Sequence, residues 1–496
     1  MSARILAALV GHAAGLLALL LAYGAPAPVG SAWRHAEGAA AQASRHVILI
    51  SIDGFAAFHL RNHAIDLPNI RALAEAGTAA DSSETVFPSV THPSHTTLLT
   101  GVTPRRHGVV DNTVTNRHTG DRFHITNLPR RQSVRVPTLF DAVKGAGGRT
   151  AALFWPETKD DPAIDNNIAE VFRPEGGADP GAVTPGLLDE LRRAGIPIDA
   201  YYDFYDDPFG HGAGDLALTR AAAYVLARRT PALTALHLLV TDKAQHEFGP
   251  SHYLSWAALT TADHCIGLLR RAVADAGLTE RTTFVIAADH GFVTTPYEMN
   301  VAPLVTERAL EGRVKWRTDK WYLYAETTSR YEPSRDGPLL DAVLARLRRT
   351  PQVSRVIGPG DLAALGFPDY EDNPYARGHV IVAAEIDTFL VLDPADPSTT
   401  PRSRGKPYHG HGYLPDHPAM YPALILSGAG IAPGRRLGHV RNIDVAPTIA
   451  ALLGIDLPGV DGRVLREAFL AAGAGTGEPL STAAAGWRAS GHPGGG

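Results

Sequence analysis

The sequence predicts an α/β protein with a doubly wound, mostly parallel central sheet flanked by helices. Three observations support this prediction. Continuous apolar runs of strand length recur along the chain, which is typical of strands buried on both faces of a parallel sheet. Segments with helical periodicity lie between these runs. Three of the runs end directly at an aspartate, as expected where strand ends line a ligand-binding crevice.

The expected elements alternate along the chain from about residue 44. The predicted strands are His46–Ile52, Thr150–Phe154, Leu233–Val240, Thr283–Ala288 and Tyr421–Leu426. The predicted helices are Leu67–Ala76, Pro137–Val143, Thr184–Ala194, Ala217–Arg229, Trp256–Ala276 and Val445–Leu453. Together these elements predict one main domain made of residues 44–294 and 407–470.

Residues 295–406 show a different pattern. Here two shorter strand candidates, Trp321–Ala325 and Val380–Ala384, flank a predicted helix at Leu339–Arg349. Short strands around a helix indicate an α+β unit rather than a continuation of the parallel sheet. We therefore expect this segment to form a small inserted cap subdomain between the two parts of the main domain.

The two ends of the sequence are expected to lie outside the fold. Arg4 precedes a long apolar run, Ile5–Tyr23, and small residues follow it. This arrangement in residues 1–43 predicts a signal peptide for export or an N-terminal anchor, because the run is long enough to span a bilayer. The rest of the chain is then exported, to the periplasm or beyond the cell. Residues 471–496 are rich in Gly, Ala and Ser and are expected to be disordered.

Composition excludes several classes of protein. The 496 residues include 46 Lys+Arg and 51 Asp+Glu, and this net charge of −5 leaves no footprint for non-specific binding to nucleic acid. The single cysteine, Cys265, excludes an internal disulfide and a cysteine-based zinc module. The 22 histidines instead direct attention to metal sites with imidazole ligands.

Three aspartates directly follow predicted strands, namely Asp53, Asp242 and Asp289. Because the carboxyl ends of parallel strands meet at one edge of a sheet, these carboxylates are expected to lie close together. They would then repel one another unless cations neutralise them. A single aspartate in such a position usually starts a turn or caps a helix, but three in corresponding positions favour a metal site.

Histidines accompany these aspartates. His290 directly follows the last of them, and His246 lies four residues after the second, a spacing that fits one helical turn or a tight loop. His411 lies in a His-Gly-His-Gly-Tyr segment, where His409 is a rival candidate. Three aspartates and three histidines can supply two sites with mixed nitrogen and oxygen ligands. Such a set suits Zn²⁺ best, and other divalent first-row metals also fit it.

A candidate nucleophile, Thr91, lies in a Phe-Pro-Ser-Val-Thr-His-Pro-Ser-His segment. Pro93 favours the first turn of a helix that starts there, and Gly101 is a plausible stop. Backbone N–H groups at a helix N-terminus point toward an anion, and a hydroxyl bound there to a divalent cation can lose its proton near neutral pH. Taken alone, Thr91 is better explained as a helix cap.

Together the motifs resemble those of the alkaline phosphatase superfamily, and within it the nucleotide pyrophosphatase/phosphodiesterase (type I phosphodiesterase) branch. The motifs that carry this resemblance are Ile-Ser-Ile-Asp53-Gly-Phe, Phe-Pro-Ser-Val-Thr91-x-Pro-x-His, Thr-Gly-x-x-Pro-x-x-His-Gly-Val-Val-Asp-Asn112, Asp242-x-x-x-His246-x-x-Gly-Pro, Ala-Asp289-His290-Gly and His411-Gly-Tyr. They follow the family order across roughly residues 45–455. The resemblance implies an alkaline phosphatase-like fold for the main domain.

The resemblance also implies a role for each site residue and a cofactor set of two Zn²⁺ per chain. Thr91 would be the nucleophile that forms a phosphothreonine intermediate, and Asn112 would contact a phosphoryl oxygen. The residues that would hold the first zinc ion are Asp53, Thr91, Asp289 and His290, and those that would hold the second are Asp242, His246 and His411.

The sequence departs from the family pattern beside the nucleophile. His92 stands where the family usually has an aromatic residue that helps to hold a nucleobase, which leaves the nucleotide preference open. Lys159 and Tyr205 are further candidates for the substrate pocket. Lys159 would suit the carboxylate of a phosphonate substrate, whereas Tyr205 belongs to a tyrosine-rich segment that could equally pack in the core.

These observations predict an exported two-zinc phosphodiesterase/nucleotide pyrophosphatase. Its expected partner is a small-molecule phosphodiester, nucleotide or phosphonate substrate, and only the N-terminal segment would tether it to a membrane. A phosphonoacetate-type phosphonate hydrolase with the same metal and threonine arrangement is the alternative. A non-catalytic metal-binding pseudoenzyme or receptor is the alternative from a different class.

Overall fold

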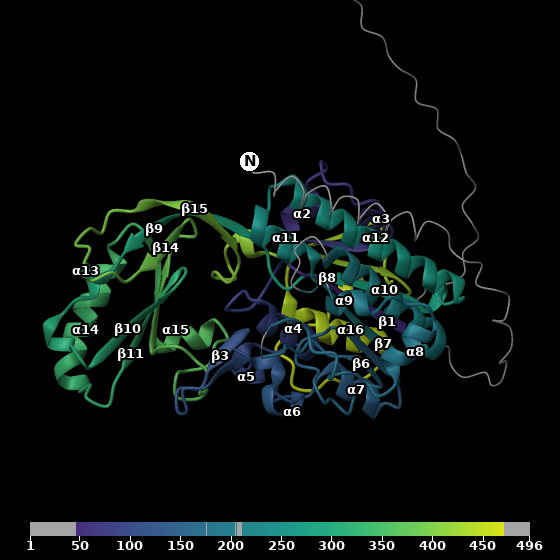
Figure 1. Ribbon diagram of the computed structural model, residues 1–496, viewed down its shortest axis with the longest axis horizontal. Helices are drawn as coiled ribbons and strands as arrows, with labels where there is room; N and C mark the ends of the chain where they lie inside the picture. The colour runs from purple at the N-terminus through teal and green to yellow at the C-terminus, as the bar shows by residue number, and fades with distance from the viewer. Residues whose placement is uncertain (1–45, 175, 204, 206–210, 471–496) are drawn as a thin grey trace, which may run out of the picture. The chain divides into compact units, whose positions relative to one another are not determined.

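An eight-stranded sheet forms the centre of the computed structural model, which describes residues 46–470 except 175, 204 and 206–210 (Figure 1). The predictions for residues 1–43 and 471–496 therefore fall outside the described residues. Among the described helices, none is both long enough and apolar enough to cross a membrane. In spatial order the strands are β17 (Arg435–Arg441), β2 (Thr78–Glu84), β16 (Leu424–Gly428), β8 (Thr282–Ala287), β1 (His46–Ile52), β7 (Leu233–Leu238), β5 (Thr150–Leu153) and β6 (Asn166–Ile168).

All but one of these strands run in the same direction. β1 pairs in parallel with both β7 and β8, and β5 pairs in parallel with β6 and β7. β16 is antiparallel to its neighbours β8 and β2, and β17 is parallel to β2. The predicted mostly parallel sheet is therefore confirmed. The apolar run that predicts a strand at Tyr421–Leu426 forms β16, which starts three residues later and is the one reversed strand.

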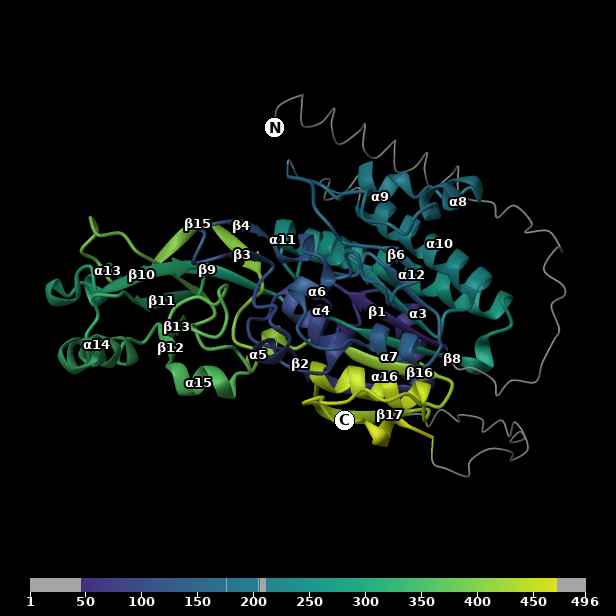
Figure 2. The same cartoon turned by 90° about the horizontal axis from the view of Figure 1, so that it is seen from below.

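Helices cover both faces of this sheet, as a doubly wound fold requires. Strand β1 shows the reason, because Ile48 and Ile50 pack into one apolar cluster and Val47 and Leu49 into the other. Figure 2 shows α10 and α12 on one side of β1, and α7 and α16 on the other. The helices of the first face are α3 (Pro68–Ala76), α8 (Leu187–Arg193), α9 (Asp199–Asp203), α10 (His211–Arg229) and α12 (Tyr253–Asp275), and those of the second are α4 (Thr91–Thr100), α7 (Leu139–Gly145) and α16 (Val445–Leu453).

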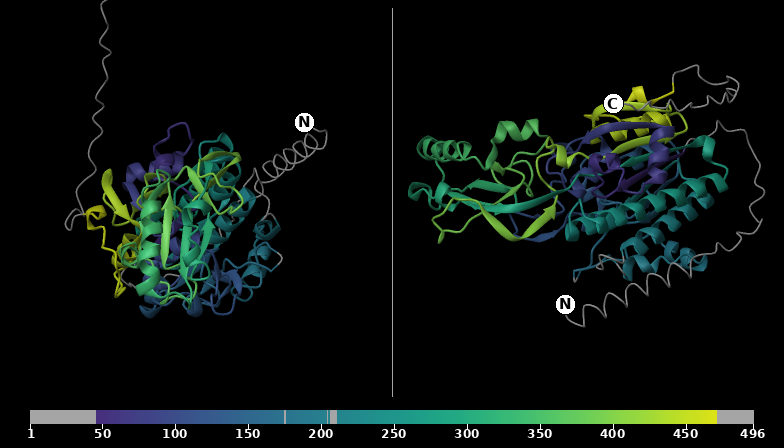
Figure 3. Two further views of the ribbon diagram at one scale, coloured as in Figure 1. Left: turned by 90° about the vertical axis from the view of Figure 1, so that its left-hand side faces the viewer. Right: turned by 90° about the horizontal axis from the view of Figure 1, so that it is seen from above.

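The apolar runs of the sequence do not predict the two strands at one side of the sheet, β2 and β17. Both strands are rich in polar and charged residues, because only part of each is buried. They pair through residues far apart in the sequence, such as Thr78 with Arg435. In Figure 3 the yellow C-terminal elements accordingly lie beside the purple N-terminal ones.

The segment between β8 and β16 forms two smaller sheets. Antiparallel strands in the order β10-β11-β13-β12 make one sheet, which packs with a helix, α14, around its own apolar cluster. The other sheet has the order β14-β9-β15. Figure 1 shows β10, β11 and α14 in green, away from β1 and β7. The bounds are β9 (Val293–Asn300), β10 (Val314–Asp319), β11 (Tyr322–Thr327), α14 (Pro333–Arg348), β12 (Val353–Ile357), β13 (Val380–Ala384), β14 (Thr388–Val391) and β15 (Arg402–Gly410).

The helix that starts at Thr91 forms as the sequence predicts. Pro93 lies in the first turn of α4, and Gly101 ends the helix with a φ of 67°, in the left-handed region that favours glycine. All ten residues of α4 are buried. The remaining short elements are α2 (Ala57–Arg61), α5 (Pro104–His107), β3 (Thr113–Thr115), β4 (Arg122–His124), α6 (Arg130–Ser133), α13 (Ala302–Val305) and α15 (Pro359–Ala364).

Replacing Gly101 is expected to destabilise the protein more than replacing a glycine with the same backbone conformation in open space. A Cβ at Gly101 would lie 3.0 Å from Pro447 and 3.1 Å from Val460, whereas one at Gly454, which has the same φ of 67°, has no neighbour within 4 Å. Gly454→Ala should cost about 1 kcal/mol from the left-handed backbone alone. Gly101→Ala should cost a further ~1–3 kcal/mol from overpacking. Urea unfolding of the two variants measures the difference, and equal losses would contradict this prediction.

Candidate metal centre and nucleophile

Three buried aspartates meet at one edge of the central sheet. Asp53 directly follows β1 and Asp289 lies two residues beyond β8. Asp242 lies in the first turn of α11 (Val240–Phe248), the helix that follows β7. Because β1 lies between β7 and β8, the sheet order brings the three side chains together. Their exposed fractions are only 4%, 0% and 8%, respectively.

Three histidines complete what we call the Asp/His cluster, namely Asp53, Asp242, Asp289, His246, His290 and His411. Asp242 Oδ1 lies 3.3 Å from His246 Nε2 and 3.4 Å from His411 Nε2. His290 Nε2 lies 3.4 Å from Asp53 Oδ1 and 3.0 Å from Asp289 Oδ2. Helix α11 thus presents two ligands from one face, because its residues 242 and 246 are one turn apart.

Each histidine of the cluster turns the same nitrogen toward it. The Nδ1 atoms lie 2.9 Å from the His409 carbonyl oxygen for His246, 3.0 Å from that of Gly291 for His290, and 3.1 Å from that of Ser89 for His411. A carbonyl only accepts hydrogen bonds, so each Nδ1 must carry a proton, and in the neutral imidazole each Nε2 then keeps a lone pair directed toward the cluster. This arrangement suits imidazoles that bind a metal.

The carboxylates leave oxygens without hydrogen bonds inside the cluster. Asp53 Oδ1, Asp242 Oδ1 and Asp289 Oδ2 are all buried and have no hydrogen-bond partner among the described residues. Burying an unpaired carboxylate oxygen costs free energy that a cation would offset. The donor set of carboxylate oxygens and imidazole nitrogens therefore fits one or more divalent metal ions.

The geometry divides the ligands somewhat differently from the sequence expectation. Two triplets have ligand atoms within 4.8 Å of one another, Asp242–His246–His411 and Asp53–Asp242–His290. Asp242 thus takes part in both triplets of the described residues, whereas Asp289 belongs to neither and lies 3.0 Å from His290 Nε2 through its Oδ2 atom. Of the two rival histidines, His411 lies in the cluster. The His409 ring instead contacts Thr294 Oγ1 at 2.9 Å.

Burial and neighbouring charges shift the pKa values of the cluster in opposite directions. Burial raises the pKa of Asp53, and the carboxylates of Asp289 and Asp242 raise it further. Burial opposes ionisation of Asp289 as well, but the adjacent imidazole outweighs it and holds that pKa below its usual range. The same pairing raises the pKa of His290 to about 9 against the effect of burial. Burial lowers the pKa of His411 to about 3. A bound cation would relieve this conflict, since it favours ionised carboxylates and neutral imidazoles.

Thr91 and Asn112 lie beside the cluster. Thr91 Oγ1 is 3.5 Å from His290 Nε2, at the first residue of α4. The Asn112 side chain accepts a hydrogen bond of 2.9 Å from the His92 backbone N–H. Because this bond occupies the amide oxygen, the amide NH₂ group of Asn112 is left as a donor. The site therefore presents a hydroxyl, a helix N-terminus and an amide donor together.

The three sequence candidates for a substrate pocket lie in other surroundings. The His92 ring is buried, with Nδ1 2.7 Å from Glu157 Oε1, so it has no free face for a nucleobase. Lys159 Nζ contacts the Asn127 carbonyl oxygen at 3.0 Å. Tyr205 is buried in the apolar cluster of the first sheet face, as its alternative packing role predicts. Phe204 of the same tyrosine-rich segment lies outside the described residues.

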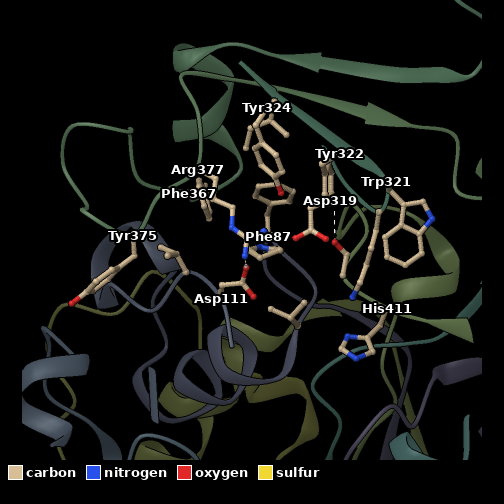
Figure 4. Close-up of a pocket in the computed structure, with 16 residues that line it drawn as sticks. Phe87, Asp111, Asp319, Trp321, Tyr322, Tyr324, Phe367, Tyr375, Arg377 and His411 are labelled. Atoms are coloured by element: carbon tan, nitrogen blue, oxygen red, sulfur yellow. Dashed lines mark hydrogen bonds and ion pairs between the residues drawn. The ribbon is translucent and has the colours of Figure 1, made fainter. Parts of the chain in front are cut away.

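A pocket instead opens between His411 of the Asp/His cluster and the β10–β11 sheet (Figure 4). His411 lines one end, together with Val90, which precedes Thr91. Asp111, which precedes Asn112, also lines the pocket. Arg377 lines the other end, paired with Asp111 at 2.7 Å. Figure 4 shows tyrosine rings and Trp321 along the wall that the smaller sheet contributes. The isolated motifs of the sequence do not reveal this pocket, because most of its wall comes from residues far from them.

The sequence profile described as type I phosphodiesterase / nucleotide pyrophosphatase matches residues 47–354. Ectonucleotide pyrophosphatase/phosphodiesterase family member 3 from Mus musculus is 23% identical over 435 residues, which cover 83% of this chain and 42% of that protein. Venom phosphodiesterase 1 from Crotalus adamanteus is 24% identical over 247 residues, 49% of this chain and 25% of that protein. The chain thus spans less than half the length of these relatives.

Solved structures share the fold. Human ectonucleotide pyrophosphatase / phosphodiesterase 5 superposes with a TM-score of 0.60 at 17% sequence identity, covering 84% of this chain and 97% of that one. An inactive variant of the murine protein in complex with AMP has a TM-score of 0.58 at 16% identity, with the same coverage. At this level of identity, the likeness establishes the fold alone.

Alanine substitution of His411 and of His409 tests which of these two histidines binds a metal ion. If two divalent ions occupy the cluster, as the sequence predicts, His411→Ala should remove one imidazole from the Asp242–His246–His411 triplet and lower the zinc content of purified protein by about one ion per chain. His409→Ala should leave the content unchanged, because its ring points to Thr294. Elemental analysis of both variants checks this expectation. Equal zinc content in the two variants would contradict the assignment of His411.

Proposed function

The chain belongs to the type I phosphodiesterase / nucleotide pyrophosphatase family, and we propose that it hydrolyses phosphodiester or phosphoanhydride bonds at the Asp/His cluster. One observation carries this proposal. The Thr91 hydroxyl lies 3.5 Å from His290 Nε2, at a helix N-terminus and beside the Asn112 amide. A nucleophile, a set of metal ligands and a donor for a phosphoryl oxygen are thus within reach of one phosphorus atom.

We assign two Zn²⁺ ions to the cluster as cofactors. Asp53, Asp289 and His290, with the Thr91 oxygen, would hold one, and Asp242, His246 and His411 would hold the other. Three unpaired carboxylate oxygens and three Nε2 lone pairs support this assignment. When bound, the ions would neutralise phosphate charge and favour the alkoxide form of a coordinated hydroxyl.

The chain's own residues then account for a double displacement. Thr91 Oγ1 loses its proton to solvent and attacks phosphorus, and the bond to the leaving oxygen breaks, which yields a phosphothreonine intermediate and a leaving group that takes up a proton. Water then attacks this intermediate and loses a proton, the Thr91–phosphorus bond breaks, Thr91 Oγ1 takes up a proton, and the phosphate monoester leaves. The Asn112 NH₂ group donates a hydrogen bond to a non-bridging oxygen throughout, and the N-terminus of α4 adds its partial positive charge.

The substrate that fits best is a nucleotide or another small phosphodiester. Two substituents on phosphorus require space beyond the cluster, and the pocket beside His411 supplies it for one of them. Among the described residues, the carboxylates of the cluster form ion pairs only with histidines, and no arginine pairs with them. The relatives named above are pyrophosphatases and phosphodiesterases, and one neighbouring structure holds AMP. They favour phosphate diesters over phosphonates.

We also propose that the protein acts outside the cytoplasm, in the periplasm or as a secreted protein. The names of its relatives, an ectonucleotide pyrophosphatase and a venom phosphodiesterase, support export. The apolar segment near Arg4 supports it independently, as a signal peptide or an anchor.

Substitution of Thr91 tests the proposed nucleophile. Thr91→Ala should lower kcat by at least ~10³-fold, because the covalent route is lost while the remaining site still binds substrate. Its zinc content should stay near two, since all six Asp/His ligands remain. Thr91→Ser keeps a hydroxyl in reach and should retain far more activity. A fully active Thr91→Ala protein with two zinc ions would exclude the covalent mechanism.

Comparison of diesters with monoesters tests the substrate class. With aryl substrates that share one leaving group, kcat/KM for the diester should exceed that for the monoester by about tenfold or more, equivalent to ~1.4 kcal/mol of transition-state binding. The reason is the pocket for a second substituent and the lack of an arginine at the cluster. Nucleotides and phosphonoacetate complete the panel. Higher kcat/KM for the monoester would contradict the proposed specificity, and dominant cleavage of phosphonoacetate would favour a phosphonate hydrolase.

A further inference from the structure

A second group of buried ionisable side chains lies behind the Asp/His cluster. It consists of His92, Glu157, Glu170 and His237, none of which is more than 4% exposed. None of these side chains belongs to the ligand triplets of the described residues. Burial of charged groups is costly unless they are paired. The contacts of these four side chains therefore indicate their role in the structure.

His237 is held between a metal-ligand candidate and two acceptors. Its Nε2 atom lies 3.0 Å from Asp53 Oδ2. Its Nδ1 atom lies 3.3 Å from the Phe154 carbonyl oxygen and 3.4 Å from Glu170 Oε2. The sheet sets this placement, because β7 pairs with β1 and the Asp53 backbone N–H bonds to the Leu238 carbonyl oxygen at 2.9 Å. Both edges of the ring are thus fixed.

This contact divides the two oxygens of Asp53. Oδ2 accepts the hydrogen bond from His237, whereas Oδ1 has no hydrogen-bond partner and lies 3.4 Å from His290 Nε2. A carboxylate that is free to rotate could offer either oxygen, or both, to a cation. Here one oxygen is already engaged on the side away from the cluster.

We propose that His237, braced by Glu170, is a positioning residue that turns Asp53 so that Oδ1 alone faces the metal. The inference rests on the proposed metal site and deepens it. Outer residues that hydrogen-bond a ligand orient it and contribute to metal affinity. In this chain the outer residue is an imidazole that acts on a carboxylate, on the strand next to the one that carries the ligand.

Glu170 extends the same support to the helix that carries Thr91. Its Oε1 atom lies 3.8 Å from His92 Nε2, and His92 Nδ1 lies 2.7 Å from Glu157 Oε1. Glu157 Oε2 in turn accepts a hydrogen bond of 3.1 Å from Thr96 Oγ1 in α4. One buried carboxylate therefore contacts the imidazole behind the metal ligand and the imidazole that follows the nucleophile. This explains why His92 is buried rather than placed to stack on a base.

Zinc affinity of two His237 variants tests the proposal. His237→Leu removes the donor to Asp53 and should raise the dissociation constant of one zinc ion by ~10–100-fold, measured by competition with a chromophoric chelator. His237→Gln can still donate from its amide at nearly the position of Nε2, and should recover most of that affinity. Glu170→Gln should give an intermediate loss, because it weakens the brace but keeps His237.

His46→Leu is the matched control. His46 lies at the other end of β1, is equally buried and contacts the Pro231 carbonyl oxygen at 2.9 Å. Its replacement should reduce stability to urea without changing zinc affinity. Wild-type affinity in a folded His237→Leu protein would overturn the proposal and leave the metal site intact. If His237→Leu fails to fold, the other two variants decide. The proposal then requires near wild-type zinc affinity in His237→Gln and a weaker affinity in Glu170→Gln, and equal affinity in these two variants would overturn it. Absence of zinc binding by the wild-type protein would overturn the metal site itself.

Discussion

Repulsion among three buried carboxylates is the constraint on which the rest of the site depends. Asp53, Asp242 and Asp289 lie at one sheet edge, and each leaves an oxygen without a hydrogen bond. Ionised carboxylates in a poorly solvated space repel one another strongly, and burial by itself favours their neutral forms. The surrounding imidazoles offset only part of this cost. A fold that holds these carboxylates together therefore needs bound cations to offset their repulsion.

The parallel sheet is what makes such a convergence possible. β7, β1 and β8 are neighbours that end at the same edge, so residues from distant parts of the sequence emerge side by side. Helix α11 then starts where β7 ends and supplies two ligands one turn apart. Backbone carbonyls of Ser89, Gly291 and His409 orient the three imidazoles. The scaffold therefore determines the tautomers as well as the positions of the ligands.

Around this centre the chain builds two different environments. On one side, the pocket that adjoins His411 is walled largely by the smaller β-sheet, and Arg377 in its wall pairs with both Asp111 and Asp319. On the other side, His237 is hydrogen-bonded to Asp53 and lies 3.4 Å from Glu170, and these buried residues support Asp53 from behind. The open side is where a substituent of a substrate has room. The buried residues on the other side have no room for substrate and instead fix the position of Asp53.

Several features of this protein follow from the amino-acid pattern of short segments alone. Apolar runs predict β1 and the other strands of the sheet centre, an aspartate at each strand end predicts where ligands gather, and Thr91, Pro93 and Gly101 predict the bounds of α4. Each signal is contained within a few residues. The resemblance to a known family added the assignment of roles, and the choice of His411 over His409 matches the observed cluster.

Other features depend on contacts between residues far apart in the sequence and are visible only in the folded chain. The polar strands β2 and β17 pair with each other. Strand β16 runs antiparallel to both of its neighbours, β8 and β2, although its apolar pattern resembles that of the parallel strands. The place of Asp242 in both ligand triplets, and the role of His237, also follow from sheet register. A lone histidine within an otherwise apolar strand was the one local signal of that role. The contacts of His237 are with residues more than sixty positions away along the chain. The hydrophobic periodicity of the sequence carries no information on such contacts, because the packing of the folded chain sets which side chains are buried and hydrogen-bonded together.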